Sequence, residues 1–227
     1  MPDKDNDLAL RAGHRERLRQ NFLDNNIAKY ELLELLLSYA IPRHDVRPLS
    51  RLLYKKFGGI YPILSASVQE LMNVPGVGKN VAIFIKVVQQ IMLEGYKCKM
   101  SDVTIFHSEE QFNNYCLLML SEKHIEELHV LYLDTDGRLL EDELHSTGSL
   151  DYTELHNREI IKKAISLDAK FIVLVHNHPK PNSSFSSQDV EATKLLRDAL
   201  HTVEIVLYDH YVVSGGIVYS MKRGHML

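Results

Sequence analysis

Two histidines and an aspartate are spaced in a pattern that can bind a metal ion. His176 and His178 follow an apolar run, Phe171 to Val175, whose β-branched composition is typical of a buried strand. Alternate residues of a strand point to the same side, so both imidazoles can be directed at one point. Asp189 follows His178 by eleven residues, and the proline-containing loop between them is long enough to bring its carboxylate back. Two imidazoles and one carboxylate are a catalytic zinc set, whose fourth position is left for water.

Each part of this pattern also has a structural explanation. A His-x-His on a strand is common, and Ser186-x-x-Asp189 has the spacing of a capping box at a helix start. The order strand, His-x-His, proline loop, serine and aspartate within one stretch favours metal binding over separate structural roles. The sequence therefore predicts that His176, His178 and Asp189 bind one zinc ion.

The same residues carry a family resemblance. His-x-His, seven residues, Ser, two residues, Asp matches the motif of the JAMM (MPN-type) metalloproteins, and His176-Asn-His-Pro179 resembles the RadC family within them. The resemblance runs from about residue 10 to the end of the chain and includes Val130-Leu-Tyr-Leu-Asp134, Gly148-Ser-Leu150, Asn157-Arg-Glu159 and Asp209-His210. It implies zinc on the two histidines and Asp189, Ser186 polarising the scissile group or the water, and an upstream glutamate as general base. The chain departs from the family at Lys180-Pro181, where Ser-Gly is usual, and at Phe185-Ser186, where Pro-Ser is usual.

The resemblance leaves the general base to be placed. Glu141 and Glu143 are two apart on an expected strand and so face the same side. Glu143 takes the position of the family's glutamate when Arg138 and residues 148–150 are aligned with their counterparts. We therefore predict Glu143 as the base that takes a proton from the water, with Glu141 as the alternate. An exposed position on an edge strand is the other explanation of an acidic residue there.

The composition is that of a soluble globular protein. The chain has 227 residues, of which 45% are apolar and 25% charged, enough for one large domain or two small ones. It has no run of eighteen apolar residues that would predict a membrane span, and its polar start does not resemble a signal peptide. Without an export signal, Cys98 and Cys116 are expected as free thiols, so we expect a cytoplasmic protein.

Two domains are predicted, a helical one over residues 1–96 and an α/β metal-binding one over residues 105–227, with a connector from residue 97 to about 112. Helices are expected at 11–23, 31–39 and 49–57, the last ended by Gly58-Gly59. Residues 1–96 carry 13 Lys or Arg against 10 Asp or Glu, and the rest carry 13 against 20. A mildly basic first domain is compatible with a nucleic-acid partner but does not establish one.

One motif of the first domain suggests a DNA contact. Leu71 to Ala82 resembles a helix-hairpin-helix, whose glycines Gly76 and Gly78 would let the backbone approach a phosphate. Amides at the start of the next helix attract an anion, and Lys79 adds a cation that contacts phosphate without reading sequence. The alternative is a tight turn whose glycines serve packing only. Weak, sequence-independent DNA binding is therefore a hypothesis.

The second domain is expected to be a mixed sheet flanked by helices. In order, the pattern predicts a helix at 111–120, strands at 127–134 and 139–146, a helix at 156–167, a strand at 171–175, a helix at 187–201, and strands at 204–208, 211–213 and 217–220. Asp134 to Arg138 is expected to be an Asp-Gly hairpin turn rather than a calcium loop. His145 and His210 either support the metal site or serve the fold. This architecture agrees with the JAMM/MPN fold, similar to that of cytidine deaminases, which the resemblance implies.

Two classes of function stay open. The first is a zinc-dependent hydrolase, a metallopeptidase or isopeptidase that acts on an amide bond. A nuclease would use the same metal site on a phosphodiester, but one zinc ion with one glutamate fits amide hydrolysis better. The second is a non-enzymatic DNA-associated protein of the repair type, to which the resemblance to RadC also points, with a structural metal site. An open position on the metal favours the first class, and a closed site favours the second.

Overall fold

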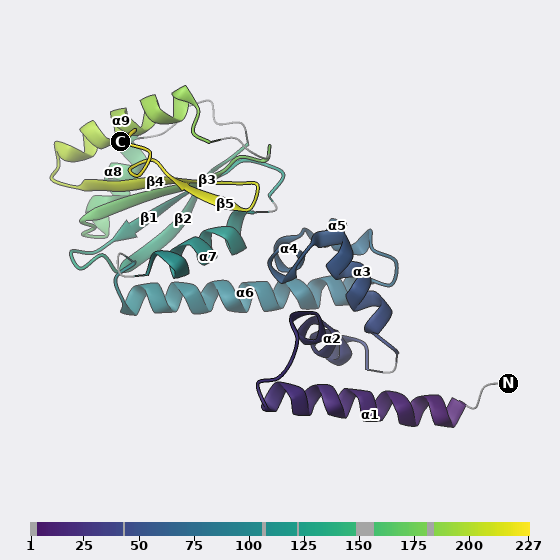
Figure 1. The fold of residues 1–227 in the computed structure, drawn as a ribbon. Helices are drawn as coiled ribbons and strands as arrows, with labels where there is room; N and C mark the ends of the chain where they lie inside the picture. The colour runs from purple at the N-terminus through teal and green to yellow at the C-terminus, as the bar shows by residue number, and fades with distance from the viewer. Residues whose placement is uncertain (1–3, 43, 106–107, 122, 149–156, 181–183) are drawn as a thin grey trace. The chain divides into compact units, whose positions relative to one another are not determined.

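The computed structural model describes residues 4–42, 44–105, 108–121, 123–148, 157–180 and 184–227 (Figure 1). Residues 149–150, which are part of the family resemblance, and Pro181, where the chain departs from the family, lie outside the described residues. The chain divides into two compact units, residues 1–89 and 90–227, and the division falls inside helix α6 (Lys79–Asp102). The predicted domain boundaries stay a prediction, but the expected connector contains the end of α6 and the start of α7 (Glu109–Leu120). Within the described residues, none of the helices has the length and apolar character needed to cross a membrane.

The first unit is helical, as predicted. Its helices are α1 (Lys4–Leu23), α2 (Lys29–Ala40), α3 (Arg47–Phe57), α4 (Ile60–Ser65), α5 (Val68–Met72) and the beginning of α6. Apolar side chains such as Leu37, Leu53 and Ile85 are buried in its core. Gly58 ends α3 in the left-handed region, with φ 82°, which confirms the predicted glycine cap.

The predicted helix-hairpin-helix turn connects α5 to α6. Gly76 has φ 93°, a conformation that favours glycine, and a Cβ atom there would meet Leu49 at 3.4 Å. Gly78 borders open space, and the exposed Lys79 is the first residue of α6. The turn therefore has the predicted shape, while phosphate binding by Gly76, Gly78 and Lys79 stays a prediction.

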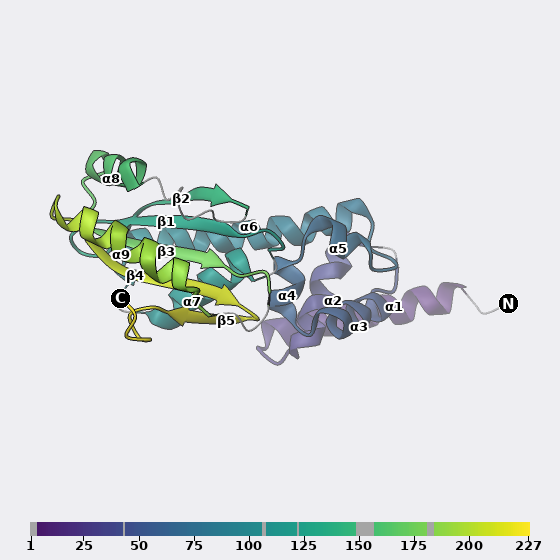
Figure 2. The same cartoon turned by 90° about the horizontal axis from the view of Figure 1, so that it is seen from above.

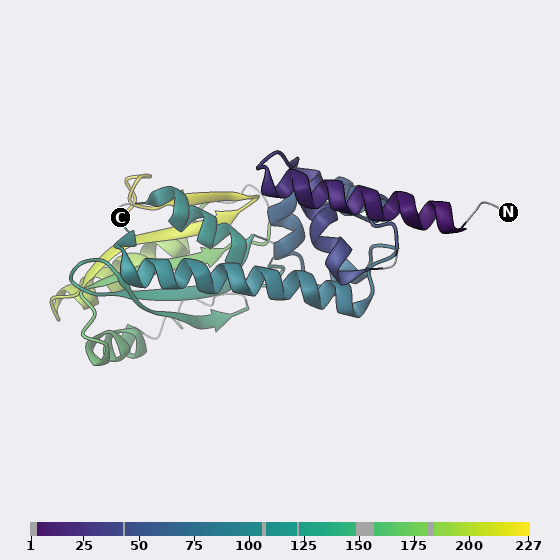
Figure 3. The ribbon, with the colours of Figure 1, turned by 90° about the horizontal axis from the view of Figure 1, so that it is seen from below.

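The second unit is built on a five-stranded mixed sheet with the order β2-β1-β3-β4-β5. The strands are β1 (Glu127–Leu133), β2 (Leu139–Thr147), β3 (Phe171–Asn177), β4 (Val206–Ser214) and β5 (Ile217–Ser220). Strands β3 and β4 are parallel, and the other neighbours are antiparallel. Helices α8 (Asn157–Ser166) and α9 (Ser187–His201) pack on one face, as the view from above shows (Figure 2). Helix α7 and the end of α6 pack on the other (Figure 3). The predicted α/β fold class is confirmed.

Two strand predictions need correction. Strand β3 continues through His176 to Asn177, so the first histidine belongs to the strand itself. The two short strands predicted at 204–208 and 211–213 are one strand, β4. Its register shifts opposite β3, where Ile172 pairs with Leu207 but Val173 pairs with Asp209. The polar residues Asp209 and His210 suggested a break in the sequence, but both side chains are buried and have hydrogen-bond partners, Ser220 of β5 for Asp209 and His176 of β3 for His210.

Two smaller predictions are confirmed. The Asp134 carboxylate accepts hydrogen bonds from the amides of Asp136 and Arg138, both at 2.8 Å, so this segment is a hairpin turn. Cys98 is exposed, Cys116 is buried, and both are free thiols.

Candidate metal centre

The fold brings the three predicted metal ligands together at the end of β3. The Nε2 atoms of His176 and His178 lie 2.9 Å apart. Asp189 places Oδ1 at 3.5 Å from Nε2 of His176 and Oδ2 at 3.5 Å from Nε2 of His178. Ligand atoms about 2.0–2.1 Å from a tetrahedral ion lie roughly 3.3 Å from one another. The observed spacing therefore suits one small cation.

Asp189 caps a helix and faces the histidines at the same time. Ser186 precedes α9, its Oγ accepts a hydrogen bond from the amide of Asp189 at 3.1 Å, and Asp189 Oδ2 accepts one from the amide of Ser186 at 2.5 Å. The capping box fixes the rotamer of the fully buried Asp189 carboxylate, so the structural and metal-binding explanations are compatible. Ser186 itself is exposed, and its predicted role in polarising the substrate stays a prediction.

An acidic residue that the sequence analysis missed completes the cluster. Glu126, immediately before β1, places Oε1 at 3.9 Å from Nε2 of His176 and at 3.7 Å from Nε2 of His178. These three residues form a group able to hold a metal ion. Burial, with a further contribution from nearby Asp189, raises the pKa of Glu126 above its usual value, although His178 opposes the rise. A raised pKa makes a carboxylate a stronger base, which favours a role in accepting and returning a proton.

Glu143 does not lie beside the histidines, which corrects the predicted general base. Strand β1 lies between β2, which carries Glu143, and β3, which carries His176. The Glu143 carboxylate accepts a hydrogen bond from the Tyr132 hydroxyl at 3.3 Å instead. The alternate, Glu141, pairs with Lys163 of α8 at 2.8 Å.

The order and direction of the strands explain this difference. Strand β1 runs antiparallel to β3, and Leu128 pairs with His176. The start of β1 therefore meets the end of β3, and Glu126 arrives at the histidines. Glu143 pairs with Val130, further from the site along the sheet. In the sequence, Glu126 is recognisable only as a glutamate just before a strand. That position does not indicate a role at the metal site until the pairing of β1 with β3 is known.

Asn177, between the two histidines, holds the segment that carries Glu126. Its Nδ2 donates hydrogen bonds to the carbonyls of Lys123 at 3.2 Å and Ile125 at 3.1 Å. Its Oδ1 accepts one from the amide of Glu127 at 2.9 Å. The buried Asn177 side chain therefore fixes the backbone on both sides of Glu126.

His210 lies behind His176 in the buried interior. Its Nε2 is 2.7 Å from Nδ1 of His176, and its Nδ1 is 2.7 Å from the hydroxyl of Thr193. Burial lowers the pKa of His210 to about 4 and lowers that of His176 as well, so both rings are neutral at pH 7. The ring of Phe185, where the family usually has proline, packs against both, with centroids 5.5 Å from His210 and 6.4 Å from His176.

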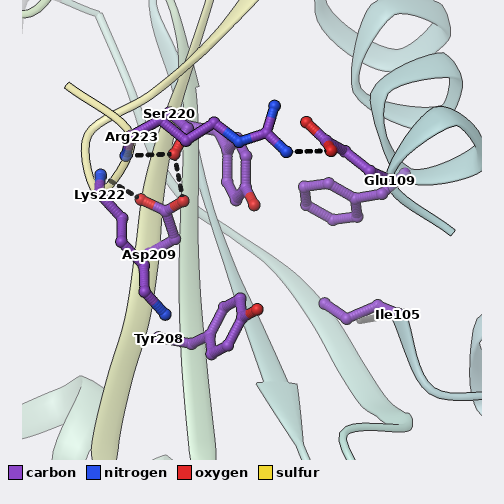
Figure 4. Close-up of a pocket in the computed structure, with 9 residues that line it drawn as sticks. Ile105, Glu109, Tyr208, Asp209, Ser220, Lys222 and Arg223 are labelled. Carbon is purple, nitrogen blue, oxygen red and sulfur yellow. Dashed lines mark hydrogen bonds and ion pairs between the residues drawn. The ribbon is translucent and has the colours of Figure 1, made fainter. Parts of the chain in front are cut away.

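A separate cavity of about 280 Å³ opens on the face of the sheet that α7 covers (Figure 4). Its walls include Phe112, Tyr208 and Tyr211. The buried Asp209 carboxylate accepts hydrogen bonds from the Ser220 hydroxyl at 2.5 Å and from the Lys222 amide at 3.0 Å. Successive strand residues point to opposite faces of the sheet. The Asp209 side chain therefore binds Ser220 and Lys222 near the C-terminus, while the His210 side chain contacts His176 on the other face.

The residues present fit a metal cofactor, and comparisons with known proteins agree with this geometry. A family model described as a RadC-like JAB domain matches residues 106–226. A UPF0758 protein from Fusobacterium nucleatum is 34% identical over 230 residues, which cover 97% of each chain. A UPF0758 protein from Ruegeria pomeroyi is 33% identical over 212 residues, covering 92% of this chain and 95% of the relative. The chain therefore belongs to the RadC family and carries a RadC-like JAB domain.

Proposed function

We propose that the protein is a zinc-dependent hydrolase of the JAMM type that cleaves an amide bond in a peptide or an isopeptide. The observation that carries this proposal is the position of Glu126, whose Oε1 lies within 3.7–3.9 Å of both histidine Nε2 atoms. Structural zinc sites are typically closed by four Cys or His ligands, whereas catalytic zinc sites commonly use histidines with a carboxylate. A hydrolase also needs a group such as the Glu126 carboxylate to move a proton.

His176, His178 and Asp189 would hold the zinc ion, because they offer two imidazoles and one carboxylate at the right spacing. Zinc bound by three protein ligands lowers the pKa of a water molecule to roughly 7 and polarises a carbonyl group.

Glu126 would take one proton from the attacking water while the water oxygen forms a bond to the amide carbon. It would return that proton to the amine nitrogen as the carbon–nitrogen bond breaks, so the carboxylate is regenerated. Burial favours this role, since it brings the pKa of Glu126 closer to neutral. The exposed Ser186 hydroxyl, next to Asp189, would contact the substrate carbonyl.

The replacement Glu126→Gln tests the proposal directly. The amide has the size of the carboxylate but cannot accept the proton, so we expect zinc content to be retained and hydrolysis to fall roughly 10²–10⁴-fold. Zinc content is measured by elemental analysis, and activity is measured on a peptide and isopeptide library. Glu143→Gln is the matched control and should stay active. Full activity of Glu126→Gln with loss of activity in Glu143→Gln would reverse the assignment.

A further inference from the structure

A chain of hydrogen bonds runs from the metal centre into the core through three side chains that are almost completely buried. His176, Thr193 and His210 are each at most 1% exposed. The chain starts at Nδ1 of His176, passes through both nitrogens of His210 and the hydroxyl of Thr193, and ends at the carbonyl oxygen of Asp189. Its end point decides where every proton in the chain lies.

The Asp189 carbonyl can only accept a hydrogen bond, and it lies 2.5 Å from Oγ1 of Thr193. The Thr193 hydroxyl must therefore donate its single proton to this carbonyl. Its oxygen is then the acceptor for Nδ1 of His210, so that nitrogen carries a proton. In a neutral imidazole the other nitrogen, Nε2, is bare, and it accepts from Nδ1 of His176. His176 consequently has its proton on Nδ1 and a lone pair on Nε2.

We infer that Thr193 and His210 are positioning residues that hold His176 in the tautomer whose Nε2 lone pair faces His178 and Asp189. This inference rests on the proposed metal site, because that lone pair is the one a metal ion would use. It gives a purpose to His210 and to Thr193, which lies one helical turn after Asp189 on α9.

The opposite proton order is disfavoured by the end of the chain. If His176 carried its proton on Nε2, His210 would have to donate to Nδ1 of His176, and Thr193 would have to donate to His210. Oγ1 of Thr193 and the carbonyl oxygen of Asp189 would then face each other at 2.5 Å without a proton between them. Thr193 is fully buried, so solvent water cannot screen the repulsion between these two oxygens.

The test compares Thr193→Val, which keeps the shape but removes the hydroxyl, with Thr193→Ser, which keeps the hydroxyl. Thr202→Val is the matched control, because Thr202 is an exposed residue at the end of α9 whose hydroxyl also donates to a backbone carbonyl. Two quantities are measured on the whole chain. The first is the position of the His176 proton in the metal-free protein, from two-bond ¹H–¹⁵N correlation spectra. The second is the affinity for Zn²⁺, from competition with a chromophoric chelator.

We expect His176 of the metal-free wild-type protein to carry its proton on Nδ1, and Thr193→Val to convert it into a mixture of tautomers. Zn²⁺ affinity should fall roughly 10–100-fold in Thr193→Val, as is usual when a partner of a ligating histidine is lost. Thr193→Ser and Thr202→Val should keep the wild-type spectrum and affinity.

A wild-type His176 with its proton on Nε2 would overturn the inference. So would a Thr193→Val protein with an unchanged spectrum, or a Thr193→Ser protein that loses as much affinity as Thr193→Val. A wild-type protein that binds no Zn²⁺ would instead refute the proposed function, while the spectrum of the metal-free protein would still decide the position of the proton.

Discussion

Asn177 stands between the two metal-site histidines, and its three hydrogen bonds fix the backbone around Glu126. Asn177→Asp replaces the donor group by an acceptor that faces the carbonyls of Lys123 and Ile125. We expect zinc content to be kept, because His176 and His178 stay on β3, but turnover to fall at least about tenfold as Glu126 loses its position. Unfolding should become easier by roughly 1–3 kcal/mol, the usual cost of leaving buried polar groups unpaired. Zinc analysis, kcat and urea unfolding check this, and unchanged kcat in a destabilised variant would limit Asn177 to a structural role.

At the scale of elements, a buried acid joins two helices to the hairpin β1–β2. Asp142 of β2 bonds to His129 of β1 at 2.7 Å and to Tyr115 of α7, and it pairs with Lys97 of α6 at 3.1 Å. Burial alone would raise the pKa of Asp142, but the hydrogen bond from His129 and the other partners lower it to about 2.

Because the pKa of Asp142 is lowered, the second unit is expected to lose stability as the pH falls. A depressed carboxyl pKa contributes stability that is complete above the unfolded value near 3.8 and is lost as the pH falls through about 2. We expect Asp142→Asn to unfold more easily by about 2 kcal/mol at pH 7, and to lose less stability than the wild type between pH 4 and 2. Urea unfolding at several pH values measures both. Equal acid sensitivity of the two proteins would contradict this account.

The turn between α5 and α6 is the element that we propose for DNA contact, because Lys79 is exposed at a helix start and Gly78 borders open space. Lys79→Glu places a negative charge at the proposed phosphate position and should abolish weak duplex binding without unfolding. Lys29→Glu, at the exposed start of α2, is the matched control and should bind like the wild type. Fluorescence anisotropy with two unrelated duplexes, at several salt concentrations, measures binding. Binding that survives Lys79→Glu, or that differs strongly between the duplexes, would leave the turn with a packing role.

For the whole molecule, we expect that binding of the metal ion stabilises the folded protein against unfolding. A ligand that binds only the folded protein stabilises it by about 2.7 kcal/mol at a free concentration 100 times its Kd. Zinc should therefore raise the Tm of the wild-type protein, and a chelator should reverse the rise. The double variant His176→Ala/His178→Ala should hold no zinc by elemental analysis and show no shift. One zinc per chain in a folded double variant would remove the ligand assignment.

The sequence by itself determined those parts of the site that depend on local geometry. His176 and His178 face one point because strand residues alternate, and the capping box sets Asp189 at a helix start through two short-range hydrogen bonds. The helices of the first unit, the strands of the second unit and the glycine cap at Gly58 follow in the same way from periodicity and turn residues. Each of these features is decided by residues that are close together in the chain.

Only the tertiary structure decided the features that depend on which strands are neighbours. Glu126 reaches the histidines because β1 pairs antiparallel with β3, whereas Glu143 is one strand further away. His210 meets His176 because β4 pairs parallel with β3, and Thr193 meets His210 because α9 packs over that pair of strands. Strand order and direction are long-range choices, since they depend on how all the apolar faces of the sheet are buried together. The grouping of His176, His178 and Asp189 could therefore be predicted from the sequence, but the positions of Glu126 and Thr193 beside them could not.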